Sequence, residues 1–123
     1  MIKVTFCLHR LPHLSREAFQ KYWLENHGPL VTRNAETLGV RRYVQLHRLE
    51  TETNERFRAI RGAPEPYDGV AELWFDSEEA MQRAFGAEGG RAAGKALLED
   101  ERKFIDWSRS PIWIGEKKVL VGG

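Results

Sequence analysis

The chain has 123 residues, with 19 lysines and arginines against 18 aspartates and glutamates and a formal net charge of +1. This length fits one domain over residues 1–123, and it is long enough to bury a core without a disulfide or a structural metal. Charge this balanced argues against nucleic acid or an anionic membrane as the main partner, so a small near-neutral molecule or another protein is expected instead.

No segment has the features of a targeting signal or a membrane span. Residues 2–8 alternate between apolar and polar types and lack the long apolar stretch of a signal peptide. No stretch approaches the length of a transmembrane helix. Cys7 is the only cysteine, so no internal disulfide is expected, and a reducing cytoplasm is the expected compartment.

The first predicted elements are a strand and an amphipathic helix. Residues 2–9 alternate and are rich in β-branched or aromatic types, which predicts a strand, and a turn follows at 11–14. Ser15 has the properties of an N-cap, and Glu17 in the first turn favours the helix dipole. A helix is therefore expected to begin directly after Ser15.

This helix leads into a His-Gly-Pro sequence. Phe19, Trp23 and His27 follow one another at four-residue steps, so they share one stripe of the helix, and this stripe faces the core. Gly28 suits a left-handed position after a helix end, and Pro29 suits the first turn of a second helical segment. One bent helix or two short ones would therefore carry an inward-facing imidazole.

The middle of the chain contains a second strand and a long polar connection. The second helical segment closes at Gly39, and residues 40–50 alternate again, with Tyr43 near the start of this predicted strand. Residues 51–68 are polar and carry proline and glycine, and they are long for a connection in a compact domain. They predict a lid or a segment that covers a sheet edge.

The second half repeats the order of strand, helix and strand. Residues 69–75 predict a third strand, Ser77 suits the N-cap of a helix that glycines at 86–90 interrupt, and residues 110–121 predict the last strand. The order β-α-β followed by β-α-β predicts an α+β, ferredoxin-like fold, in which a four-stranded antiparallel sheet carries helices on one face.

The other face of this sheet also needs a cover. Large apolar residues occur at both parities of the first and third predicted strands, so neither face is purely polar. An exposed apolar sheet face marks an interaction surface. A homodimer joined sheet to sheet would supply the cover.

Four segments of the chain together resemble the EthD family. They are residues 2–8, residues 14–19 with the sequence Leu-Ser-Arg-Glu-Ala-Phe, Trp23 followed by residues 27–30 with the sequence His-Gly-Pro-Leu, and residues 68–77. The resemblance covers almost the whole chain. It implies a dimeric α/β barrel, in which two ferredoxin-like subunits bring their sheets together and each keeps a ligand cavity between its sheet and its helices.

The resemblance leaves several chemistries open, because similar barrels include cofactor-free monooxygenases, polyketide cyclases, decarboxylases and a methylmuconolactone isomerase. That isomerase is similar in placing a histidine at the end of the first helix and a tyrosine early in the second strand, and these positions match His27 and Tyr43. The sequence has no Gly-rich nucleotide motif after a strand, no P-loop and no cluster with metal-ligand spacing. Chemistry without a cofactor or a metal is therefore expected.

Three residues are candidates for catalysis. His27 has the ordinary pKa of a general base at neutral pH, although the same residue could cap helix carbonyls instead. Tyr43 would donate a hydrogen bond to a developing oxyanion, or would serve as a core residue with a satisfied hydroxyl. Glu72, on an otherwise apolar strand, would orient His27 or act as a second base, or would be a solvated or interface glutamate.

Four aromatic residues are candidates for the walls of a substrate slot. Stacking on their rings would hold a flat or cyclic ligand, although aromatic residues at these spacings are also typical of an ordinary core. They are Trp23, Trp74, Phe104 and Trp107.

These observations predict an EthD-like enzyme that moves protons without a cofactor, acting as an isomerase, cyclase, dehydratase or decarboxylase. A lactone, a quinone or a polyketide-like ring would suit it as a substrate. Two alternatives stay open: a non-catalytic ligand-binding or accessory protein of a degradation pathway, and a cofactor-free monooxygenase. An enclosed pocket shared by His27 and Tyr43 would favour the enzyme.

Overall fold

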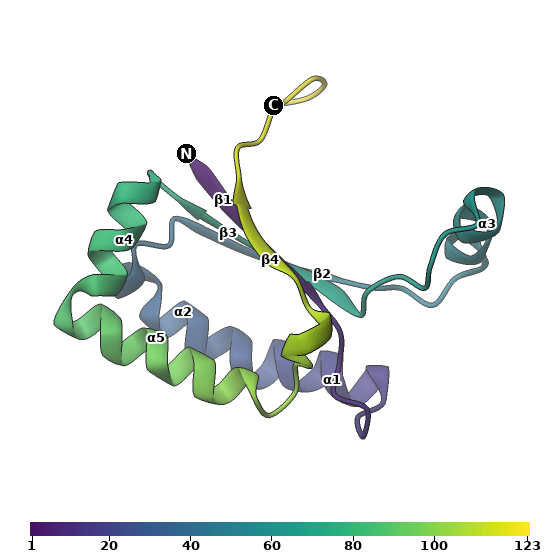
Figure 1. Cartoon of the computed structure of the whole chain (residues 1–123), viewed down its shortest axis with the longest axis horizontal. Coiled ribbons are helices and arrows are strands. Elements are labelled where there is room, and N and C mark those ends of the chain that lie inside the picture. The colour runs from purple at the N-terminus through teal and green to yellow at the C-terminus, as the bar shows by residue number, and fades with distance from the viewer.

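The computed structural model describes residues 1–123 and has the predicted α+β architecture. A single four-stranded antiparallel sheet has the order β2-β3-β1-β4, which is the order of a ferredoxin-like fold. The helices lie together beneath one face of this sheet, and the other face is left open (Figure 1). The strands are β1 (Ile2–Leu8), β2 (Arg42–His47), β3 (Gly69–Phe75) and β4 (Ile112–Gly115).

The helical layer is built from two groups, one before β2 and one after β3. A separate helix, α3, stands away from the body of the molecule at the end of two extended connections (Figure 1). No helix is both long enough and apolar enough to cross a bilayer. The helical elements are α1 (Arg16–Tyr22), a π-helical turn η1 (Trp23–His27), α2 (Gly28–Leu38), α3 (Glu52–Arg61), α4 (Glu78–Gly86), α5 (Glu88–Glu101) and a 3₁₀ turn η2 (Trp107–Arg109).

Serine caps begin α1 and α4, as the sequence predicts. The Ser15 hydroxyl accepts a hydrogen bond from the backbone N–H of Ala18 at 3.0 Å, and Ser77 accepts one from Ala80 at the same distance. Each bond satisfies one of the N–H groups that the first helical turn leaves without a partner.

The junction around Gly28 differs from the prediction. Gly28 has a right-handed φ of −53°, so the chain does not turn left-handed here but runs from α1 through η1 directly into α2. Its N–H bonds to the carbonyl of Trp23, five residues earlier. Pro29 has no N–H and its ring crowds the carbonyl four residues before it, and a widened π turn avoids that conflict. His27 therefore lies inside a continuous helical run and not at a free helix end.

Two segments have other boundaries than predicted. Residues 51–68 form a connection that contains α3, which Thr51 caps and which Gly62 ends with a φ of 59°. The sequence predicts a lid or a cover for a sheet edge over these residues, and it does not predict this helix, which the Thr51 cap and Gly62 delimit. β4 covers four residues and not the predicted 110–121, because its last pair joins Gly115 to Lys3, next to the start of β1.

The inner face of the sheet forms the core with α1 and η1. Gly69 faces this layer, and a Cβ there would lie 2.4 Å from the indole of Trp23, so the glycine makes room for the largest side chain of the core. The fully buried side chains are those of Leu8, Phe19, Trp23, Leu38, Phe75 and Phe104.

Candidate active site

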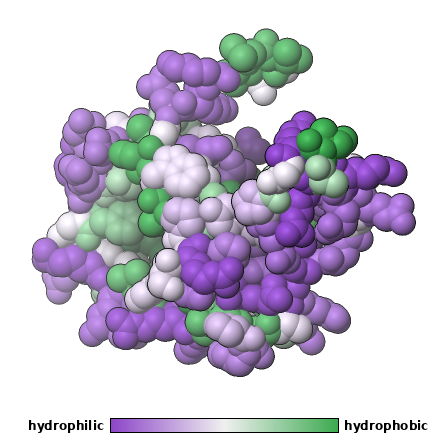
Figure 2. Space-filling model, turned by 45° about the vertical axis from the view of Figure 1, so that its right-hand side comes forward, coloured by the Kyte–Doolittle hydropathy of each residue, from purple (hydrophilic) through white to green (hydrophobic).

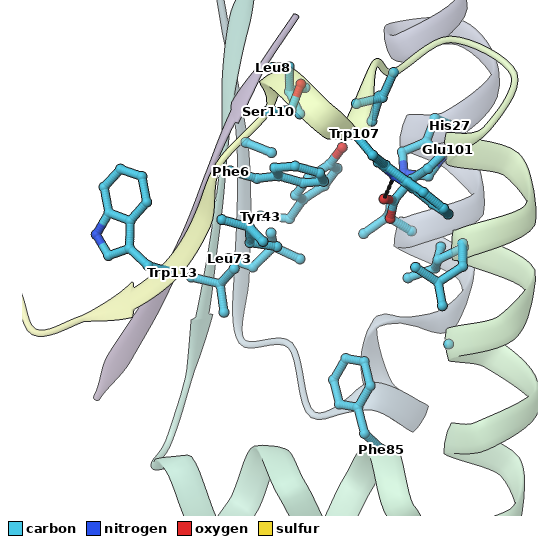
Figure 3. Close-up of a pocket in the computed structure, with 18 of the residues that line it drawn as sticks. Phe6, Leu8, His27, Tyr43, Leu73, Phe85, Glu101, Trp107, Ser110 and Trp113 are labelled. Atoms are coloured by element: carbon cyan, nitrogen blue, oxygen red, sulfur yellow. Dashed lines mark hydrogen bonds between the residues drawn. The ribbon is translucent and has the colours of Figure 1, made fainter.

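A large apolar pocket lies between the inner face of the sheet and the helices (Figure 3). Its volume is about 870 Å³, and 18 of its 24 lining residues are hydrophobic, so it suits an apolar ligand of several rings. On the surface, apolar side chains gather in a recess between polar ones (Figure 2). The labelled lining residues in Figure 3 are Phe6, Leu8, His27, Tyr43, Leu73, Phe85, Glu101, Trp107, Ser110 and Trp113.

His27 is the imidazole that lines this pocket. It is the last residue of η1 and is only 6% exposed. Its Nδ1 lies 2.8 Å from Oδ2 of Asp100 near the end of α5, and its ring packs on Phe104 with the ring centres 5.0 Å apart. Nε2 makes no hydrogen bond with the protein. One nitrogen is therefore held in place while the other is free for a ligand.

Asp100 connects His27 to Tyr22. The hydroxyl of Tyr22 donates to Oδ1 of Asp100 at 2.5 Å, and the ammonium of Lys103 lies 3.5 Å from the same oxygen. Burial alone would raise the pKa of Asp100, but the hydrogen bonds from Tyr22 and His27 outweigh it and hold this pKa below its usual value. Burial and the bond to Asp100 raise the pKa of Tyr22 to about 12. The carboxylate is thus ionised and both of its oxygens are occupied.

The protonation state of His27 follows from this setting. Burial lowers its pKa, and the hydrogen bond and charge of Asp100 oppose that shift without reversing it. The ring is therefore neutral at pH 7. Because an ionised carboxylate accepts a hydrogen bond and cannot donate one, the proton of the neutral ring sits on Nδ1. Nε2 then carries the lone pair of a base.

Tyr43 lies on β2 and lines the same pocket. Its hydroxyl oxygen accepts a hydrogen bond from Nε2 of Gln45 at 2.7 Å, and Gln45 also donates to the carbonyl of Trp23 at 3.0 Å. Burial raises the pKa of Tyr43, so the phenol stays protonated. Since the oxygen already accepts a bond, the phenolic proton is free to be donated to a ligand.

Glu101 also lines the pocket, next to Asp100 in the sequence. Its Oε1 accepts a hydrogen bond from the indole N–H of Trp107 at 3.0 Å, and the guanidinium of Arg102 lies over that indole, 5.2 Å from the ring centre. Burial raises the pKa of Glu101, and the nearby charge of Asp100 adds to this rise. The pKa values of the adjacent carboxyl groups of Asp100 and Glu101 are thus shifted in opposite directions, that of Asp100 downward and that of Glu101 upward.

Glu72 and Trp74 are not part of this pocket, against the predicted arrangement. The register pairs Glu72 with Thr5 and Trp74 with Lys3, on the open face of the sheet. Glu72 forms an ion pair with Lys3, and the ring of Trp74 lies between the charges of Lys3 and Arg42. Because side chains alternate along a strand, Leu73 takes the inward position. Glu72 therefore does not orient His27, and Asp100 does.

The remaining predicted wall residues divide into two kinds. Trp23 and Trp107 line the pocket, whereas Phe104 is fully buried behind it and supports the ring of His27. No group of three or more His, Cys, Asp or Glu side chains is placed to hold a metal ion.

Sequence reasoning missed Asp100, Tyr22 and Glu101. The two carboxyl residues lie in the run Glu-Asp-Glu at the end of a helix, which is typical of a solvated surface. One signal was available for Asp100. It lies four residues before Phe104, which places both on the same side of a helix, and because Phe104 is a core residue, Asp100 should face the core as well.

Comparisons with known proteins agree with this architecture. The model of the EthD domain family matches residues 11–108. An EthD family protein from Bacillus halodurans is 24% identical with a TM-score of 0.62, covering 96% of this chain and 99% of that one. No curated protein matches the sequence significantly.

Two further solved structures share the fold. A dimeric protein of unknown function with a ferredoxin-like fold, from Bacteroides fragilis, is 9% identical with a TM-score of 0.59 and coverage of 94% and 95%. SnoaB, a cofactor-independent oxygenase from Streptomyces nogalater, is 17% identical with a TM-score of 0.52 and coverage of 96% of each chain. The family match extends over most of the chain, and the chain belongs to the EthD family.

Proposed function

We propose that this protein is an enzyme that removes a proton from a carbon atom of a cyclic substrate, without a cofactor, with His27 as the general base. The observation that carries the proposal is that the two ring nitrogens of His27 have different surroundings. Asp100 holds Nδ1, and Nε2 is free beside a large apolar pocket. A neutral, oriented imidazole is the form that a base requires at neutral pH.

Tyr43 takes the role of an electrophile in this proposal. When carbon next to a carbonyl loses a proton, negative charge develops on the carbonyl oxygen, and a fixed donor stabilises that charge in the transition state. The phenol of Tyr43 is protonated and its oxygen already accepts from Gln45, so its own proton is available for this bond. Base and donor come from η1 and β2, on opposite walls of the pocket (Figure 3).

The lining of the pocket suggests the class of substrate. Hydrophobic residues make up most of its wall, and the aromatic rings of Phe85 and Trp107, which are 36% and 40% exposed, offer flat surfaces for stacking. A neutral ring system with a carbonyl group, such as a lactone, a quinone or a polyketide-like ring, would match this wall. The wall has one cationic side chain, Arg102, which is exposed and lies over Trp107, so it offers little buried charge to an anionic substrate.

Deuterium exchange with a simple ketone tests the proposal. 1-Tetralone is a neutral bicyclic ketone whose protons beside the carbonyl exchange through an enolate, and exchange in D₂O can be followed by NMR. The wild-type protein should accelerate this exchange, and His27→Asn should lower the acceleration by roughly 10²- to 10⁴-fold, which is the usual contribution of a general base. His13→Asn, in the exposed turn after β1, is the matched control.

The alternatives give different results in the same experiment. An accessory protein would bind 1-tetralone without accelerating exchange, and exchange by His27→Asn at the wild-type rate would remove the proposed base. A cofactor-free oxygenase would consume oxygen with 1-naphthol, the corresponding phenol. A solved structure with a similar fold supports including this alternative, because SnoaB is a cofactor-independent oxygenase.

A homodimer through the open face of the sheet completes the proposal. Leu46 is 59% exposed and Trp113 is 51% exposed on strands at the two edges of the sheet, and no helix of the chain covers the face between them (Figure 1). Exposed apolar side chains at both edges of this face favour association with a second copy. Sedimentation should give the mass of a dimer, and Leu46→Lys should shift it toward the monomer. A monomeric wild-type protein at all concentrations would contradict this assembly.

A further inference from the structure

Glu101 is the one carboxyl group in the pocket wall, and it has no cation as a partner. The neighbouring cations are engaged elsewhere: Arg102 lies over the ring of Trp107, and Lys103 contacts Asp100. Only Oε1 of Glu101 has a hydrogen bond, from the indole N–H of Trp107, and Oε2 has none. A carboxyl group among apolar side chains without a countercharge holds its proton more tightly than a solvated one, and the pKa of Glu101 is raised in this sense.

The end of α5 therefore carries two carboxyl groups with separate tasks. Asp100 lies behind the imidazole and fixes Nδ1, whereas Glu101 lines the pocket into which Nε2 of His27 is free to act. Figure 3 shows His27 and Glu101 on the helical wall of the pocket, with Tyr43 on the sheet wall. Groups whose surroundings push their pKa values apart form acid and base assignments in enzymes.

We infer that Glu101 is the general acid of the proposed reaction, and that the substrate class is a neutral cyclic ketone with a hydroxyl group on the carbon β to the carbonyl. This inference rests on the proposed function of His27. It extends proton removal by a second step, in which the β-hydroxyl group leaves the substrate. A base alone moves a proton, whereas a base with an acid beside it also breaks a carbon–oxygen bond.

The reaction balances without an oxidant or a cofactor. Nε2 of His27 takes the proton from the carbon α to the carbonyl, and the carbonyl oxygen gains charge that the phenol of Tyr43 stabilises. The electron pair of the C–H bond forms a carbon–carbon double bond as the β carbon–oxygen bond breaks. Glu101 gives its proton to the departing oxygen, which leaves as water. The imidazolium then returns a proton to the carboxylate of Glu101, and both groups are restored.

Two related probes separate this inference from the function on which it rests. 1-Tetralone has no leaving group, so its deuterium exchange needs only the base and the oxyanion donor. 3-Hydroxy-1-tetralone has a β-hydroxyl group, and loss of water followed by tautomerisation gives 1-naphthol, which fluoresces. The first probe reports on His27 and Tyr43, and the second also requires an acid.

Glu101→Gln is the test variant, because the amide oxygen of glutamine can still accept the bond from Trp107 but has no acidic proton. We expect it to dehydrate 3-hydroxy-1-tetralone at least about 10²-fold more slowly than wild type, and to lose far less of its rate of 1-tetralone exchange. Glu99→Gln, two residues earlier on the exposed side of α5 and paired only with Lys95, should change neither rate.

The outcomes decide between the two proposals. Dehydration by Glu101→Gln at the wild-type rate would overturn the role of Glu101, and so would a wild-type protein that exchanges 1-tetralone but does not dehydrate the hydroxyketone. Absence of exchange in the wild-type protein would instead overturn the proposed function, and the inference with it. A melting temperature of Glu101→Gln close to that of wild type shows that the variant is folded.

Discussion

Nδ1 of His27 and Oδ2 of Asp100 lie 2.8 Å apart, and this contact joins two helical elements across 73 positions of the sequence. It fixes the rotation of the imidazole and the nitrogen on which its proton sits. The second oxygen of Asp100 is held in turn by Tyr22, so the carboxylate itself cannot rotate freely. The pocket thus receives a histidine whose orientation is set before any ligand arrives.

Asp100→Asn should lower the turnover of the exchange reaction. The amide group has nearly the same shape but no charge, and its NH₂ group can face Nδ1 and favour the wrong tautomer of His27. We expect kcat for 1-tetralone exchange to fall by roughly 10- to 100-fold or more with KM little changed, because the substrate does not touch Asp100. Steady-state exchange kinetics measure this, with Glu99→Gln as the control. A rise in KM at constant kcat would speak against a positioning role.

The titration of His27 should occur below the ordinary value for histidine. Burial lowers its pKa, while Asp100, itself contacted by Tyr22 and Lys103, raises it by less. NMR titration of the ring should place the midpoint below 6.5 in the wild-type protein and lower still in Asp100→Asn. A midpoint at or above 6.5 would contradict the neutral base.

The lowered pKa of His27 also makes the stability of the protein depend on pH. The unfolded chain takes up a proton at the His27 position near the ordinary pKa of 6.5, and the folded chain takes it up only at lower pH. The free energy of unfolding should therefore fall as the pH drops from 7 through 6.5 toward the folded pKa. Urea unfolding at several pH values measures the slope, which should be smaller in His27→Asn. An equal slope in both proteins would exclude His27 as its source.

Tyr43→Phe should impair catalysis while leaving the fold intact. The change removes one phenol, and Gln45 keeps its bond to the carbonyl of Trp23. Loss of one oxyanion donor costs about 10²- to 10³-fold in kcat in well-studied enzymes, and we expect a loss of that size in 1-tetralone exchange. The melting temperature should stay within a few degrees of wild type. Undiminished exchange would assign the oxyanion to another donor.

The corner between α4 and α5 should tolerate alanine at one glycine and not at another. A Cβ at Gly90 would lie 1.7 Å from the carbonyl oxygen of Ala84, which is backbone and cannot move aside. Gly90→Ala should destabilise the protein by about 3 kcal/mol or more. Gly86→Ala meets nothing within 4 Å and should be neutral or stabilising by up to about 1 kcal/mol. Urea unfolding compares the two, and similar values would contradict the tight corner.

Much of the fold could be predicted because its signals are local. The serine caps at residues 15 and 77 and the alternation of the strands depend on neighbours in the sequence, and the structure has them where expected. The stripe of Phe19, Trp23 and His27 also faces inward as predicted. The π turn at Trp23–His27 was not predicted, because it arises from a conflict between Pro29 and the preceding helix.

The candidate site was less predictable because its partners are distant in the sequence. Glu72 is a carboxyl residue on a strand that is apolar at both parities, so alternation alone does not tell which face it takes. The pairing of β1 with β3 sets that face and directs Glu72 to the open side. Asp100 reaches His27 only because α5 packs against the layer formed by η1 and α2.

The state of the His27 ring is the most direct test of the account, and nitrogen NMR of the labelled protein measures it at pH 7.5. We predict a neutral ring protonated on Nδ1, with an Nε2 resonance that moves on addition of 1-naphthol while the Nδ1 resonance stays nearly fixed. A ring protonated on Nε2, or an Nε2 resonance that does not respond to the ligand, would contradict the account.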